Sequence, residues 1–112
     1  MKTFNDNLKI YLIKNDHVKL TVRISDNCAR EYHFSIETFE QLLEGWNTPD
    51  WLELEVLHDT SIVVEDKGNY VKFTSYKDGL IMHHRITFDD MIQLGKEYFR
   101  QKNNKMYWDQ YV

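Results

Sequence analysis

The chain has 112 residues, the size of a single domain, and 42% of them are hydrophobic, which is enough to build a folded core. One proline, four glycines and one cysteine exclude a low-complexity linker and an internal disulfide, and they favour a reducing compartment. The net charge of −4 disfavours a general phosphate-binding protein. No stretch has the roughly 18 apolar residues of a membrane span. We therefore expect one cytoplasmic domain over residues 1–112, without a signal peptide and without membrane association.

The first part of the chain is predicted to form three strands and a helix. Residues 8–13 are an apolar run, residues 17–24 alternate in polarity as a half-buried strand does, and a third strand follows at 30–34. The turn sequences KND and SDN separate these strands. The helix is predicted to start after the N-cap residue Ser35, and its apolar residues recur at spacings of 3, 3 and 4: Ile36, Phe39, Leu42 and Trp46.

The second part repeats this order after one additional strand. In the segment 51–57 the apolar residues Leu52, Leu54 and Val56 alternate with Trp51, Glu53 and Glu55, so this segment is predicted to be a strand with one apolar face. Three further strands are expected in the runs SIVVED, NYVKFTSY and LIMHHRI. A helix follows Thr87, with the same apolar spacing as the first: Phe88, Met91, Leu94 and Tyr98.

The two parts also resemble each other in sequence. A shift of 53 residues aligns KNDHVKLT, which begins at Lys14, with KGNYVKFT, which begins at Lys67, and a shift of 52 then aligns the two helices. We interpret this as an internal duplication with copies at about 8–46 and 61–99; the alternative is two unrelated strand–helix units. The fold class is therefore predicted to be α+β, a duplicated βββα–ββββα order of antiparallel strands with two helices packed on one side and a pseudo-two-fold relation between the copies.

This order of elements is similar to that of PUR repeats, a family that binds single-stranded nucleic acid. The resemblance rests on the order of elements alone. A nucleic-acid-binding domain is accordingly one functional hypothesis, in which basic residues on the strands would contact phosphates and tyrosines would stack on bases. The basic residues would be Lys19, Arg23, Lys72 and Arg85, and the tyrosines Tyr11, Tyr32 and Tyr76.

Charge is distributed unevenly along the chain. Residues 31–66 carry ten Asp or Glu and no Lys or Arg, whereas the segments before and after each have a balance of +3. Glu37, Glu40 and Glu44 are spaced to share one helix face, with no lysine four residues on to offset their repulsion. Glu53 and Glu55 share a strand face with Trp51. These residues either form ordinary solvated faces or dock a basic partner.

The C-terminal segment 103–112 is unusually aromatic for a chain end. It contains Met106, Tyr107, Trp108 and Tyr111. We expect it to pack on its own domain, or otherwise on a second subunit or a partner, because tyrosine and tryptophan are frequent anchors of interfaces. Trp108 is therefore taken as a candidate partner-binding residue.

The sequence contains no recognisable catalytic motif. His83 and His84 are neighbours on a predicted strand, so they point to opposite faces and cannot hold one ion together. His58 is placed in a turn, and Cys28 is expected to be a partly buried thiol rather than a nucleophile. We expect no catalytic residue, no metal site and no cofactor.

The favoured hypothesis is a small non-enzymatic binding protein that docks on a basic protein partner and inhibits or regulates it, as an immunity or anti-defence protein would. An origin in a phage or mobile element would fit such a protein. The expected partner-binding residues are Glu37, Glu40, Glu44, Trp51, Glu53, Glu55 and Trp108. Binding of single-stranded nucleic acid is the alternative. We also consider a homodimer, because the exposed edge strands of a pseudo-symmetric domain are available to pair with a second copy.

Overall fold

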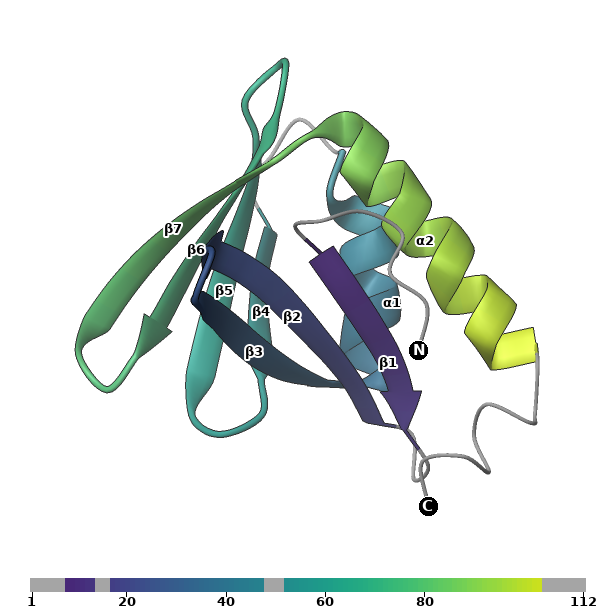
Figure 1. Cartoon of the computed structure of the whole chain (residues 1–112), viewed down its shortest axis with the longest axis horizontal. Helices are drawn as coiled ribbons and strands as arrows, with labels where there is room; N and C mark the ends of the chain where they lie inside the picture. Colours follow the sequence, from purple (N-terminus) through teal and green to yellow (C-terminus); the bar gives the residue numbers. More distant parts are fainter. Residues whose placement is uncertain (1–7, 14–16, 48–51, 104–112) are drawn as a thin grey trace.

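The structure is a computed structural model that describes residues 8–13, 17–47 and 52–103. The order of elements is three strands, a helix, four strands and a second helix, as the sequence predicts (Figure 1). Their bounds are β1 (Leu8–Ile13), β2 (His17–Ser25), β3 (Cys28–Ser35), α1 (Ile36–Gly45), β4 (Leu52–Val56), β5 (Thr60–Asp66), β6 (Val71–Lys77), β7 (Leu80–Ile86) and α2 (Phe88–Asn103).

The strands form two antiparallel sheets, so the predicted α+β class is confirmed. β1, β2 and β3 make a three-stranded sheet in chain order, and β4 to β7 make a four-stranded sheet in chain order. The two sheets meet where the backbone N–H of Leu57, just after β4, donates a hydrogen bond of 2.8 Å to the carbonyl of His33 in β3. The internal duplication and its pseudo-two-fold axis remain predictions.

Alternation of apolar and polar residues decides which face of each strand is buried. In the first sheet the inward side chains of all three strands are fully buried: Leu8, Ile10, Leu12, Val18, Leu20, Val22, Tyr32 and Phe34. The β6–β7 hairpin turns on Asp78 and Gly79, which both have positive φ (52° and 78°). That is the conformation of a two-residue Asp-Gly turn, which matches the right-handed twist of the strands on either side.

Both helices lie on the same side of the strands (Figure 1). The predicted N-caps are confirmed: the Ser35 side chain accepts a hydrogen bond from the Thr38 N–H, and the Thr87 hydroxyl accepts one from the Asp90 N–H. The apolar stripes face inward, and Phe39 of α1 stacks against Tyr98 of α2 with ring centroids 5.0 Å apart. The helices therefore share one hydrophobic core with both sheets.

The free edge of β1 is closed by a side chain of α2. Gln101 is completely buried, and its amide lies along the edge as a neighbouring strand would. Its Oε1 accepts from the Leu12 N–H at 2.8 Å, and its Nε2 donates to the Ile10 carbonyl at 2.9 Å. A buried backbone group without a partner costs about 1–3 kcal/mol, so this amide satisfies two groups that an edge strand would otherwise leave unpaired.

No helix in the described ranges is both long and apolar enough to cross a membrane.

We expect Gln101→Ala to lower the free energy of unfolding by about 2–4 kcal/mol, because two buried backbone groups lose their partner. Urea denaturation followed by circular dichroism measures this change. Gln93→Ala, at a partly exposed glutamine on the same helix, is the matched control and should change stability by less than about 0.5 kcal/mol. Equal effects of the two substitutions would show that the Gln101 amide does not hold the edge.

Candidate functional site

The acidic residues of α1 do not all have the same environment. Glu37 and Glu44 are exposed, whereas Glu40 is partly covered by α2. The Tyr98 hydroxyl donates to Glu40 Oε2 at 2.6 Å, and Lys102 Nζ donates to the same oxygen. These hydrogen bonds, that of Lys102 first, lower the pKa of the Glu40 carboxyl. The repulsion expected from the sequence is therefore relieved at Glu40 by a lysine 62 residues further along the chain.

The acidic residues of β4 face away from those of α1. Glu53 and Glu55 are exposed on the outer face of the strand, and Leu54 and Val56 are buried on the inner face. Helix α1 packs on that inner face, where Gly45 approaches the Leu52 side chain. The helix pair Glu37 and Glu44 and the strand pair Glu53 and Glu55 thus flank β4 from opposite sides. Trp51 and Trp108 lie outside the described residues.

The outer face of the four-stranded sheet carries acidic residues on β4 and β5 and basic residues on β6 and β7, with Glu65 of β5 directly paired with Lys72 of β6. Glu53 and Glu55 occupy one margin, on β4. At the other margin Lys72 of β6 and Arg85 of β7 are directly paired across the strands. Arg85 also lies over the Tyr70 ring, 4.2 Å from its centroid, a cation–π contact that holds the guanidinium in place.

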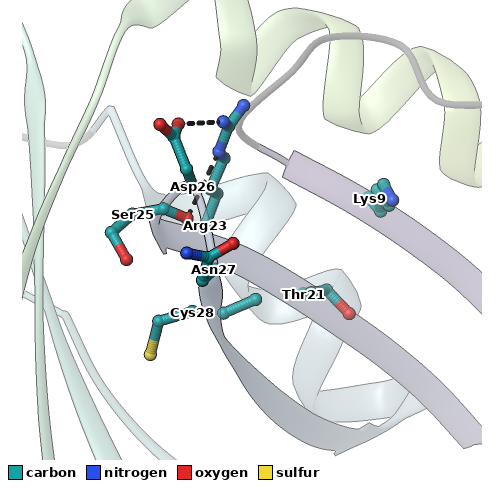
Figure 2. Close-up of a pocket in the computed structure, with 8 residues that line it drawn as sticks. Lys9, Thr21, Arg23, Ser25, Asp26, Asn27 and Cys28 are labelled. Atoms are coloured by element: carbon teal, nitrogen blue, oxygen red, sulfur yellow. Dashed lines mark hydrogen bonds and ion pairs between the residues drawn. The ribbon is translucent and has the colours of Figure 1, made fainter.

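A second basic surface lies on the outer face of the three-stranded sheet. Lys19 stands over the Tyr11 ring at 4.7 Å and lies 3.8 Å from Glu31. Near the β2–β3 turn a surface pocket of about 360 Å³ lies between Lys9, Thr21 and the turn residues (Figure 2). The Arg23 guanidinium, which lines this pocket, forms an exposed ion pair with Asp26 of the same hairpin (Figure 2), at 2.6 Å.

Tyr32, one of the three tyrosines predicted to stack on bases, is buried. Tyr32 is only 2% exposed, because β3 turns this residue into the core between the two sheets. Its hydroxyl donates to Ser75 of β6 at 2.8 Å and lies 2.6 Å from Nε2 of His84 in β7. Tyr32 therefore joins the sheets and cannot stack on a base, whereas Tyr76 is exposed.

Burial dominates the electrostatics of this polar network. It lowers the pKa of His84 to about 4 and raises the pKa of Tyr32, so both groups are neutral near pH 7. Neutral groups can share hydrogen bonds in the core without the cost of a buried charge. His83, on the opposite face of β7, is exposed, in agreement with the predicted alternation.

Three histidines that are distant in sequence lie together at the junction of the sheets. His17 Nε2 is 2.7 Å from His33 Nδ1, and the centroid of the His33 ring is 5.1 Å from that of His58. Desolvation, followed by the neighbouring histidines, lowers the pKa of both His17 and His33. The sequence analysis missed this histidine cluster (His17, His33 and His58). Its only signal was that His17 and His33 occupy outward positions of adjacent strands.

Cys28, expected to be partly buried, is exposed at the β2–β3 turn. Cys28 is the first residue of β3, nearer the turn than Tyr32 and Phe34, the buried residues of this strand. It is a free thiol.

Comparison with protein-family models, curated proteins and solved structures finds no match to this chain.

The neutral His84 should make the fold sensitive to acid. Its pKa is about 4 in the folded state and about 6.5 in the unfolded chain. As the pH falls from about 6.5 to 4, the unfolded chain binds a proton that the folded protein does not, so stability is lost over that window by on the order of 2 kcal/mol.

Urea denaturation at pH 7 and pH 4.5 measures this loss. His17 and His33 also have lowered pKa values and contribute to it, so the His84 part is the difference between the wild type and His84→Gln. His83→Gln, at the adjacent exposed histidine, should keep the wild-type pH dependence. An unchanged pH dependence in His84→Gln would contradict the assignment.

Proposed function

We propose that the protein is a non-enzymatic binding protein that docks on a basic protein partner and inhibits or regulates it. The observation that carries this proposal is the state of four carboxylates around β4: Glu37, Glu44, Glu53 and Glu55. All four are exposed, and none of them forms an ion pair with the described residues of its own chain. Exposed carboxylates without an internal cation attract a basic surface and repel an acidic one.

Glu40 has a different part in this proposal. Its carboxylate is held by Tyr98 and Lys102, so it orients α1 and does not offer a free charge to a partner. The proposed contact residues on the helix are therefore Glu37 and Glu44. Trp51 and Trp108 stay in the proposal as aromatic anchors on the grounds of sequence alone.

The two acidic pairs can be tested against each other, because they carry equal charge on opposite sides of β4. A fluorescent peptide of alternating arginine and glycine is the probe, and fluorescence anisotropy at low and moderate salt gives its affinity. Replacing the pair that docks a basic surface with glutamine should weaken binding about 3–10-fold, since each exposed charge contributes up to about 1 kcal/mol. The variants are Glu37→Gln with Glu44→Gln, and Glu53→Gln with Glu55→Gln.

Each double variant is the control for the other, because both change the net charge equally. A loss confined to one pair supports docking on that face. Equal losses, or no loss, would contradict a defined acidic docking surface. Circular dichroism checks that both variants remain folded.

Binding of single-stranded nucleic acid is the second candidate, and the duplication on which it rests gains support from the strand registers. Val18 pairs with Phe34 in the first hairpin, and Val71 pairs with Ile86 in the second. These partners are related by the shifts of 53 and 52 residues seen in the sequence. The change of shift coincides with a β-bulge at Ile24, an extra residue that the β6–β7 hairpin lacks.

For this candidate the contact residues are Lys72 and Arg85, which are cross-strand neighbours on an exposed face. If they bind phosphates, Lys72→Ala with Arg85→Ala should weaken binding of a fluorescent oligothymidine and lower the slope of log K against log salt by about 1.4. Lys96→Ala, at an exposed lysine of α2, should leave the slope unchanged. No binding by the wild type at low salt would reject the candidate.

A further inference from the structure

We propose that His17, His33 and His58 form a binding site for a divalent transition-metal ion such as Zn²⁺. Neutral imidazole is a preferred ligand of zinc, copper and nickel in proteins. The histidine cluster brings three such rings together from β2, β3 and the β4–β5 turn. It is separate from the acidic residues discussed above and plays no part in the proposed docking.

Two of the three ligands are already directed at each other. His17 and His33 lie on adjacent antiparallel strands, diagonally placed on the same outer face, since His17 pairs with Ser35 and Lys19 pairs with His33. Their facing nitrogens, Nε2 and Nδ1, are 2.7 Å apart. Ligand nitrogens around a tetrahedral zinc ion are roughly 3.3 Å apart at bond lengths of 2.0–2.1 Å. The pair is hydrogen-bonded, so one of these nitrogens carries a proton. The ion would be admitted when this bond opens by side-chain rotation and the donor ring shifts to the tautomer with its proton on the other nitrogen.

His58 is held beside this pair by the backbone. The turn that carries it is bonded to β3 through the Leu57 N–H and the His33 carbonyl, so the turn stays next to one of the ligands. His58 itself has a positive φ of 65°, and the Thr60 hydroxyl donates to its carbonyl. Its exposed ring meets His33 edge-on.

The third ligand requires a rotation of the His58 side chain. As the described side chains stand, no group of three or more His, Cys, Asp or Glu could hold a metal ion. Since His58 is exposed and its backbone is fixed, rotation about its side-chain torsions is the movement that brings a third nitrogen to the His17–His33 pair. The proposal thus concerns a site in which two ligands are neighbours that open on binding and the third closes on the ion.

A carboxylate lies near the second nitrogen of the central ligand. Glu31 Oε1 is 3.7 Å from Nε2 of His33, the ring nitrogen that does not face His17, which is longer than a hydrogen bond. A carboxylate that closes this gap and bonds the second nitrogen of a histidine ligand would fix the ring and raise its basicity. Lys19 lies on the same face but is close to Glu31 as well, at 3.8 Å, which offsets its positive charge.

Titration of the full chain with ZnCl₂ in a calorimeter tests the proposal, and CoCl₂ provides an independent reading through the visible absorption of tetrahedral Co²⁺. We expect binding of one ion per chain with micromolar or tighter affinity. His33→Ala should abolish it, and His58→Ala should weaken it at least about 10-fold. Glu31→Gln should weaken it about 10-fold, the range found for outer-shell partners of metal ligands.

His83→Ala is the matched control, because His83 is an exposed histidine on the outer face of the other sheet. It should bind as the wild type does. Failure of the wild type to bind, or equal binding by wild type and His33→Ala, would overturn the site. Unchanged binding by His58→Ala would overturn the role of the turn, and this exposed position keeps the test valid even where His33→Ala is unstable.

Discussion

The burial of the Gln101 amide against β1 is the constraint on which the arrangement of the layers depends. By taking the place of a neighbouring strand it fixes α2 along the first sheet, both in position and in rotation. Tyr98 and Lys102, on neighbouring positions of the helix surface, are then directed at Glu40 and bind it. Helix α1 is thereby tied to α2, and since α1 packs on β4 as well as on β3, the same contact reaches the second sheet.

Polar contacts align the two sheets, and few other relative positions of the sheets would satisfy them. Tyr32 reaches both β6 and β7 from β3, and its hydrogen bonds need a particular offset between the sheets. Apolar packing alone would tolerate small displacements, but a buried hydroxyl without partners would not. The backbone bond from Leu57 acts at His33, the next residue of the same strand. These contacts therefore fix the relative position of β3 and β4 where the two sheets meet.

Local patterns in the sequence were sufficient for the elements, their order and the helix caps, because alternation, the 3–4 spacing and N-cap residues act within a few residues. They could not reveal contacts made between distant segments. Lys102 beside Glu40, Tyr32 in the core and the meeting of His17, His33 and His58 all depend on registers and on the junction of the sheets. The bulge at Ile24 shows the limit clearly, since one extra residue there sets the pairing of the whole hairpin.

The histidine cluster lies at the junction of the two sheets, beside the acidic strand but without sharing a residue with it. Glu53 and Glu55 lie on β4, and the turn bearing His58 follows that strand directly. An ion bound by His33 and His58 would add a bond between β3 and this turn, in parallel with the backbone hydrogen bond from Leu57.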